Sequence, residues 1–328
     1  MSCYHPLKGF LTGQLTDKGK REIFISSHDV DTIPYEKVVK KFGHDYKYDP
    51  EYMRLLGNSM VFYNFIEIPC GHCIGCRLDY SLDWAMRVIC EASQFDFNYF
   101  VTLTYDDVHL PKDGKVSKRD LQLFNKKIRN KFGDGVRFFG CGEYGSKYLR
   151  PHYHVIYFNL PLSDLVPFGK NREGDNYFVS QELSALWNKG FVLVADVSLR
   201  SAAYVARYSM KGLKNTLPGY EPFLLMSRRP GIGSNFVQTK LFDIYSTDHV
   251  YLKFDETKKS LKPNRYFDSQ LEKRFPDLLE QWKDIRRYYS EIAQTSQLAN
   301  SPFYDVRDLR DELEKRKEDS AKRLKRMG

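Results

Sequence analysis

Hydrophobic and polar residues repeat with two different periods in the central part of the chain. Between residues 78 and 94, apolar residues recur every three or four positions, which predicts a helix with one face in the core. A basic helix with its own apolar stripe is expected at 118–132, after Ser117 as its N-cap. Stretches rich in β-branched and aromatic residues predict strands at 98–105, 136–145, 150–158 and 191–195.

The pattern is weaker on both sides of this central part. We expect short strands near 23–25 and 61–63, loops at 44–50 and 161–179, and helices at 180–189, 201–212 and 271–293. The last residues mix acids and bases densely, which is typical of an exposed helix or a frayed tail at 305–328. The predicted segments are an N-terminal region at 1–94, a core at 95–214 and a basic C-terminal extension at 215–328.

The composition of the chain favours a partner that carries phosphate. The 328 residues have a formal net charge of +9, and 15% of them are aromatic. Cations attract phosphates and aromatic rings stack on bases, so this combination suits nucleic acid. The chain shows neither a signal peptide at its start nor an apolar run long enough to span a membrane, so we expect a cytoplasmic protein without a membrane partner.

Three of the six cysteines lie within one short motif, Cys70-Gly-His-Cys73-Ile-Gly-Cys76. Two residues between cysteines allow both sulfurs to face one ion, so this doubled spacing predicts a structural zinc site. Such a site needs four ligands, and Cys3 is the first candidate for the fourth, with His72 second. Unligated thiols are the alternative, and a redox pair is less favoured because no thioredoxin-like pattern surrounds the motif.

Two histidines, His152 and His154, are two positions apart on a predicted strand. Alternate side chains of a strand point to the same face, so these imidazoles are expected to stand side by side. Such a pair can chelate a divalent metal, although many pairs of this kind are surface or hydrogen-bonded histidines. The preceding strand is expected to pair antiparallel with this one, which returns Glu143 towards His152. Glu143 is therefore the expected third ligand, and Asp106 is the alternative.

The predicted helix at 201–212 carries Tyr204 and Tyr208 four residues apart on one face, with Lys211 three residues further on. Such a row is usually core packing with a lysine that reaches solvent. Beside a metal that withdraws electron density from a phosphate, it supplies phenols and a cation for attack on phosphorus. The products of that attack are a phosphotyrosine and a free hydroxyl on the other DNA end.

Basic side chains near these elements are expected to contact DNA phosphates, and each of them also suits a solvated surface. They are Arg77, Arg87, Lys126, Lys127, Arg129, Arg207, Arg228 and Arg229.

Three ordered motifs resemble the HUH endonucleases that start rolling-circle replication. They are Phe100-Val-Thr-Leu-Thr-Tyr105, Arg150-Pro-His152-Tyr-His154 and Tyr204-Val-Ala-Arg-Tyr208-Ser-Met-Lys211. Together with the cysteine motif they are most similar to the gokushovirus-type replication initiation proteins of microviruses, over roughly residues 70–233. The resemblance implies an α+β fold whose central antiparallel β-sheet is flanked by helices. To this core we add the zinc-stapled N-terminal region and a mostly helical C-terminal extension.

The resemblance also implies roles for the site residues. His152 and His154 bind Mg²⁺ or Mn²⁺, Tyr204 or Tyr208 or both act as nucleophile, and Lys211 assists the phosphate or the phenolate. In members with two tyrosines, one nicks the origin and the other resolves the circle after a round of synthesis. Tyr153 is aromatic where many members have an aliphatic residue, and it is expected to face away from the metal.

The implied function is initiation of phage rolling-circle DNA replication. A site-specific single-strand endonuclease forms a covalent 5′-phosphotyrosine at the origin, leaves a 3′-hydroxyl primer and later rejoins the displaced strand. The implied partners are single-stranded origin DNA and the helicase and polymerase of the host, in the bacterial cytoplasm. The alternatives are a plasmid or transposon nickase and a non-catalytic, zinc-dependent nucleic-acid-binding protein.

Overall fold

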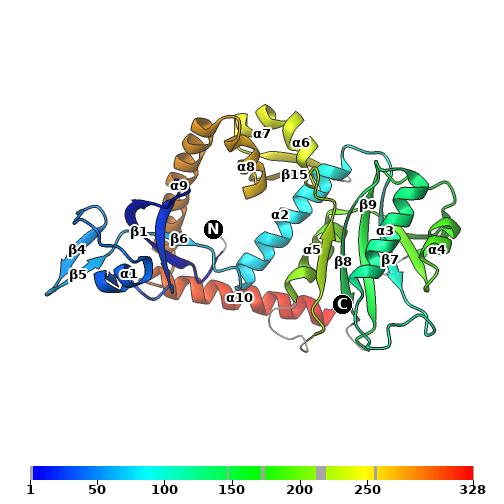
Figure 1. Ribbon diagram of the computed structural model, residues 1–328, viewed down its shortest axis with the longest axis horizontal. Coiled ribbons are helices and arrows are strands. Elements are labelled where there is room, and N and C mark those ends of the chain that lie inside the picture. Colours follow the sequence, from blue (N-terminus) through cyan, green and yellow to red (C-terminus); the bar gives the residue numbers. More distant parts are fainter. Residues whose placement is uncertain (1–2, 146–147, 171–173, 212–218, 255–256, 328) are drawn as a thin grey trace. The chain divides into compact units, whose positions relative to one another are not determined.

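The computed structural model divides into two compact units (Figure 1). Met1–Asp79 and Tyr288–Gly328 form the first unit, and Tyr80–Arg287 form the second. These units divide the chain differently from the predicted segments, because the C-terminal helix belongs with the N-terminus. The structure describes residues 3–145, 148–170, 174–211, 219–254 and 257–327, and within them only the backbone of residues 207–211, 253–254, 257–259 and 322–327.

The first unit contains two small antiparallel sheets around an aromatic core. One sheet has the order β2-β1-β6, from β1 (Leu7–Leu15), β2 (Arg21–Ser26) and β6 (Phe65–Ile68). The other has the order β3-β5-β4, from β3 (Ile33–Pro34), β4 (Met53–Leu56) and β5 (Ser59–Phe62), and α1 (Tyr35–Phe42) follows β3. Phe10, Val38 and Phe62 are fully buried in the core that these elements share.

The C-terminal residues form an ordered helix in the first unit rather than a frayed tail. In α10 (Val306–Met327), Leu309 is buried and Arg310 makes two hydrogen bonds of 2.7 Å to the carboxylate of Glu67. His5 and the backbone N–H of Ile74 also contact Glu314 on this helix. Contacts to segments distant in the sequence therefore hold the helix against the rest of its unit.

The second unit is organised around a seven-stranded sheet with the order β10-β11-β12-β7-β9-β8-β13. Every pair of neighbours is antiparallel, which confirms the central antiparallel sheet. The strands are β7 (Asn98–Thr104), β8 (Arg137–Tyr144), β9 (Pro151–Phe158), β10 (Val166–Lys170), β11 (Asn176–Val179), β12 (Val192–Asp196) and β13 (Phe223–Met226).

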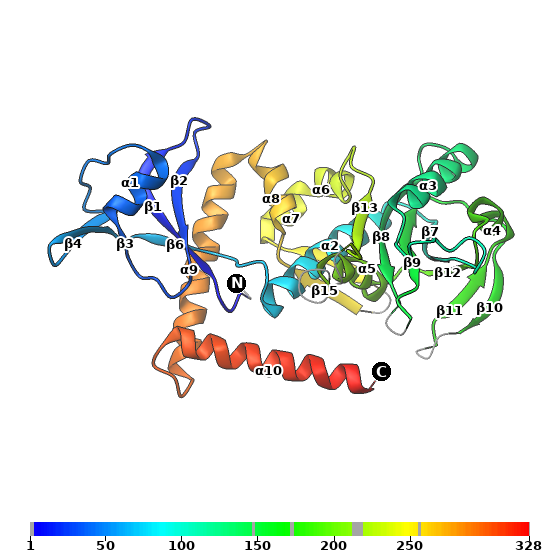
Figure 2. The ribbon, with the colours of Figure 1, turned by 60° about the horizontal axis from the view of Figure 1, so that its bottom comes forward.

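Helices cover both faces of this sheet, as expected (Figures 1 and 2). On one face, α3 (Lys118–Phe132) and α4 (Gln181–Trp187) pack against alternate residues of the central strands, such as Val101 and Val155. On the other face, α5 (Leu199–Lys211) and part of α2 (Ile74–Ala92) pack against the intervening residues, such as Phe139 and Ile156. Because both faces are buried, the central strands are almost continuously apolar.

The remaining elements of the second unit complete the core on the α5 face. Their buried residues include Val237, Ile244 and Phe267. The elements are α6 (Ser234–Thr239), α7 (Leu241–Thr247), β14 (Val250–Phe254), β15 (Thr257–Leu261), α8 (Arg265–Glu272) and α9 (Pro276–Ala299). No helix in the described part of the chain is long and apolar enough to cross a membrane.

Two expectations for the secondary structure were wrong. The region 161–179 contains the hairpin β10–β11 rather than a loop, and the side chains of β10 are all exposed, so no alternation marks them. The helix expected at 271–293 is interrupted between α8 and α9, because Pro276 suits the first position of a helix and starts a new one. On α2, Leu82 lies exposed although its spacing assigned it to the buried stripe.

An ion-pair network holds α9 to α7 and α8. Arg286 donates hydrogen bonds of 2.8 Å to Asp248 and 2.7 Å to Asp268. The Asp248 residue is 2% exposed, and its hydrogen bonds with Arg286 compensate its removal from water. The neighbouring Arg287 is instead exposed and pairs with Asp284 at the surface.

We predict that Arg286→Met destabilises the protein, because it leaves the buried Asp248 carboxylate without its guanidinium partner. The free energy of unfolding should fall by about 3 kcal/mol, measured by urea denaturation followed by circular dichroism. The matched control Arg287→Met removes a surface ion pair and should change the stability little. Equal stability of the two variants would contradict this account of the network.

Candidate metal centre and active site

The register of three neighbouring strands places a carboxylate beside the two histidines. β9 lies between β7 and β8, with Glu143 opposite His152 and Thr102 opposite His154. Glu143, His152 and His154 therefore project from the same face of the sheet, the one that α5 covers. The sheet thus positions three side chains by backbone pairing alone, without a loop.

The ligand atoms of these residues converge on one point. Nε2 of His152 lies 3.1 Å and Nε2 of His154 lies 3.0 Å from Oε1 of Glu143. The two imidazole rings are nearly perpendicular, with their centroids 4.9 Å apart. One donor atom from each of the three residues lies within 4.8 Å of the others.

Hydrogen bonds on the far side of each ring orient the imidazoles. Nδ1 of His152 lies 3.1 Å from the carbonyl oxygen of Arg150, which can only accept, so Nδ1 donates and the neutral ring keeps its lone pair on Nε2. Nδ1 of His154 lies 3.0 Å from Oγ1 of Thr102, and the ring stacks on Phe100 at 5.3 Å between centroids. Both Nε2 atoms are therefore directed at the carboxylate.

Burial and hydrogen bonding set the charges in the site. Burial lowers the pKa of His154, more than its hydrogen bond with Glu143 raises it, so the ring is neutral at neutral pH. Burial raises the pKa of Glu143, but the hydrogen bonds and charges of His152 and His154 outweigh it and lower the pKa overall. The site therefore combines an anionic carboxylate with a neutral imidazole, which are the protonation states that metal ligation requires.

These residues fit a divalent metal. Neighbouring ligands of an octahedral Mg²⁺ lie about 3 Å apart, close to the observed separations of the Nε2 and Oε1 atoms. Glu143 is 1% exposed, and its Oε2 is one of the few buried polar atoms in the described residues that have no hydrogen-bond partner. A bound cation would satisfy this oxygen. Asp106, the alternative ligand, lies outside this group and accepts hydrogen bonds from His109.

The structure brings Tyr204 to the metal ligands. Its hydroxyl donates a hydrogen bond of 3.3 Å to Oε1 of Glu143, and its ring lies 5.1 Å from that of His154. The backbone of α5 continues through the positions of the other predicted catalytic residues, one and two turns further on. The side chains of Tyr208 and Lys211, and that of the predicted DNA contact Arg207, lie outside the described residues.

Two residues that orient the site, Phe100 and Thr102, had no predicted role. A signal for Thr102 was present, because a strand paired with the histidine strand must place some residue opposite His154. Tyr153, between the histidines, points to the α3 face as expected and is fully buried there. Its hydroxyl donates to the carbonyl oxygen of Ser117, next to the start of α3.

The four predicted zinc ligands gather in the first unit. The sulfurs of Cys70 and Cys76 are 3.9 Å apart, as are those of Cys73 and Cys3, and all four lie within 4.8 Å of one another. Sulfurs at 2.3 Å from a tetrahedral zinc are roughly 3.8 Å apart, so the spacing fits this ion. His72 is exposed and outside the group, and the four cysteines form no disulfide.

The predicted DNA-contacting residues have different surroundings. Lys126, Arg129, Arg228 and Arg229 are exposed, and Arg77 is half-buried on α2. Lys127 instead donates to the carbonyl oxygen of Leu186 at the end of α4, at 2.8 Å. Arg87 lies between the rings of Trp84 and Tyr266 and donates to a backbone carbonyl, so it is not available to phosphates.

Comparison with known proteins adds independent information. Residues 98–213 match the family model of the replication-associated protein ORF2. The replication-associated protein ORF2 of Spiroplasma virus 4 is 34% identical over 224 residues, which are 64% of this chain and 69% of that protein. The chain belongs to this family of replication-associated proteins. The motif-based resemblance is thereby confirmed at the level of the family.

Other family members match over shorter stretches. The replication-associated protein VP4 of Bdellovibrio phage phiMH2K is 33% identical over 56% of this chain and 62% of its own length. The replication-associated protein ORF4 of Chlamydia phage 1 is 35% identical over 44% of this chain and 38% of its own length. No solved structure matches the chain significantly. The matched family region contains β7, β8, β9 and α5, and so all the residues of the metal centre.

We predict that Glu143→Gln abolishes Mn²⁺ binding, because it removes the only charge among the three grouped ligands. Thr102→Val should weaken Mn²⁺ binding by about 10- to 100-fold, since His154 loses the group that orients it. Both effects are measurable by titration of Mn²⁺ with electron paramagnetic resonance. Asp106→Asn serves as the control and should bind Mn²⁺ normally. Loss of binding in this variant and retention in Glu143→Gln would reverse the assignment.

We predict that the purified protein contains one zinc ion per chain, detected by plasma mass spectrometry. Cys70→Ser should lose the zinc and lower the melting temperature, because the thiolates bring together segments far apart in the sequence. His72→Ala should retain the zinc, since this side chain is exposed. A zinc-free wild-type protein, or a zinc content that depends on His72, would show the assignment to be wrong.

Proposed function

We propose that this protein initiates phage DNA replication by nicking one strand of the origin and joining it covalently to a tyrosine. The observation that carries this proposal is the contact between the Tyr204 hydroxyl and Glu143, beside the two Nε2 atoms. A phenol at the edge of a candidate metal centre is where a nucleophile must stand to reach a phosphate held there. The relatives named as phage replication-associated proteins support this choice of process.

The proposed reaction exchanges one phosphoester for another. A divalent metal, when bound, supplies positive charge that stabilises the phosphate oxygens in the transition state. The oxygen of Tyr204 forms a bond to phosphorus while the bond to the 3′ oxygen breaks. The 3′ oxygen leaves with the bonding electrons, takes up a proton and becomes a free 3′-hydroxyl. The 5′ phosphate stays on the tyrosine, so the reverse reaction rejoins a strand.

The residues around Tyr204 prepare it for this step. Glu143 is ionised, so it accepts the hydrogen bond that directs the phenol, and His154 holds the ring edge-on. An ordinary tyrosine has a pKa near 10 and is a weak nucleophile at neutral pH, so orientation and nearby positive charge must lower the barrier. We assign Tyr208 as the second nucleophile and Lys211 as the assisting cation, because both follow Tyr204 on α5.

The proposed partners follow from this reaction. Single-stranded origin DNA is the substrate, and the 3′-hydroxyl serves a host polymerase, with a host helicase to separate the strands in the bacterial cytoplasm. A non-catalytic zinc-dependent binder is less favoured, because the Glu143 site is built within the second unit from residues that include none of the four grouped cysteines. A plasmid or transposon nickase is less favoured because the similar proteins named here come from viruses.

We predict that the protein with Mn²⁺ forms a covalent adduct with single-stranded origin DNA, detected as a shifted band in a denaturing gel. The double variant Tyr204→Phe/Tyr208→Phe should form no adduct, because it lacks both phenols, while its DNA binding survives. Mass spectrometry of the peptide that carries the nucleotide assigns the first nucleophile in the wild type. Adducts that persist in the double variant would rule out these tyrosines.

A further inference from the structure

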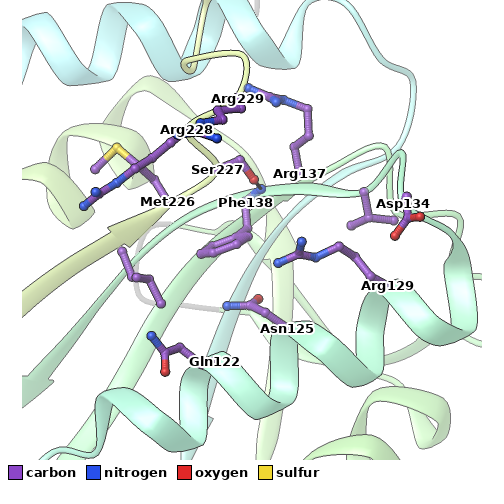
Figure 3. A pocket seen from close by; sticks show the side chains of 12 residues that line it. Gln122, Asn125, Arg129, Asp134, Arg137, Phe138, Met226, Ser227, Arg228 and Arg229 are labelled. Atoms are coloured by element: carbon purple, nitrogen blue, oxygen red, sulfur yellow. Dashed lines mark hydrogen bonds between the residues drawn. The ribbon is translucent and has the colours of Figure 1, made fainter.

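A second candidate site lies between α3 and the edge strand β13. Figure 3 shows a pocket of about 480 Å³ in which Gln122, Asn125 and Arg129 come from α3. Met226, at the end of β13, and the following turn with Arg228 form the opposite wall. The α3 residues are spaced three and four apart, so they share one face of that helix. The volume is within the range of small-molecule sites.

This pocket is separate from the metal centre. Phe138, which lines the pocket, and Glu143 are five residues apart on β8, whose pairing with β9 is continuous between them. Side chains alternate along a strand, so an odd separation puts the two on opposite faces. The pocket is on the α3 face, about 17 Å along the strand from the carboxylate. A ligand in the pocket therefore does not touch the metal ligands.

The charge of the pocket is positive. Arg129, Arg228 and Arg229 are exposed at its rim and make no ion pair within the described part of the chain. Arg137 also lines the pocket, but Glu91 pairs with it, and Asp134 is the one acidic residue among those that line it. Three guanidinium groups without an ion pair against one carboxylate favour an anion, and guanidinium groups bind phosphate with two hydrogen bonds.

A buried amide adds a second, independent signal. Asn125 is 2% exposed, and its Oδ1 accepts a hydrogen bond of 2.7 Å from the hydroxyl of Tyr157. This hydroxyl is fully buried and must donate, which fixes the orientation of the amide. The Nδ2 group then has no acceptor in the described residues, and Figure 3 shows it turned towards the pocket. A donor buried without a partner indicates that an acceptor from a ligand belongs there.

We propose that this pocket binds a nucleotide, with its phosphate on Arg129, Arg228 and Arg229. The amides of Asn125 and Gln122 then face the acceptor atoms of the base, and the ring of Phe138 forms the apolar floor. A phosphate ion alone would leave most of the volume empty, whereas a nucleotide combines an anion, hydrogen-bond acceptors and an aromatic ring. The nucleotide comes either from a DNA strand that passes the edge of the sheet or from the free nucleotide pool.

Binding measurements in EDTA test this proposal without the nicking reaction, so its failure is distinguishable from failure of the proposed function. The probes are a fluorescein-labelled oligothymidylate, followed by anisotropy, and dAMP, followed by calorimetry. In the variant Arg129→Ala/Arg228→Ala we expect about tenfold weaker binding or more, since two charged hydrogen-bond donors are lost. For the oligonucleotide, the slope of log affinity against log salt should also shrink by roughly 1.4.

The matched control is Lys118→Ala/Arg119→Ala, which removes the same charge from the exposed start of α3, about 15 Å from Arg129. Weaker oligonucleotide binding in the pocket variant alone supports the proposal with DNA as the source. Loss of dAMP binding with unchanged oligonucleotide binding supports it with a free nucleotide as the source. Equal losses in both variants, or no loss of either probe, would overturn it.

Discussion

The alignment of β9 between β7 and β8 is the constraint on which the candidate active site depends. It places Glu143 directly opposite His152 and Thr102 opposite His154, so that one backbone register determines ligands and orienting group together. A shift of one residue would send the histidines to the α3 face, into the apolar core around Tyr153. The apolar residues that alternate with the ligands therefore protect the geometry of the site as well as the stability of the sheet.

Burial gives this small group of polar residues its chemical character. Glu143 has lost nearly all contact with water, yet it stays ionised because imidazoles surround it. An anionic oxygen that lacks a partner in such a place is costly, and a divalent cation removes that cost. The same environment restricts Tyr204 to one orientation, with its hydroxyl on the carboxylate. Affinity for a metal and the placement of a nucleophile thus have one physical origin.

The two faces of the sheet support different kinds of chemistry. The α5 face holds the metal centre, whereas the α3 face ends in a basic pocket beside the edge strand β13. In the first unit, the four sulfurs connect Cys3 to the start of α2, a separation of 67 residues between Cys3 and Cys70. A metal bound there closes a long loop, which stabilises a unit whose sheets are short.

The sequence by itself determined the elements whose signals are local. β-branched and aromatic runs identified the central strands, Ser117 caps α3 through its side chain as expected, and the spacing of His152 and His154 placed them on one face. Local spacing also identified the cysteine motif. The hairpin β10–β11 was missed because its exposed first strand has no apolar face.

Only the tertiary structure decided the choices that depend on distant residues. It selected Glu143 over Asp106 beside the histidines and Cys3 over His72 in the cysteine cluster. It also joined α10 to the N-terminal unit, and formed the basic pocket from α3 and the turn after β13. These contacts are set by strand register and by the packing of whole elements, and neither leaves a pattern in the residues next to them along the chain.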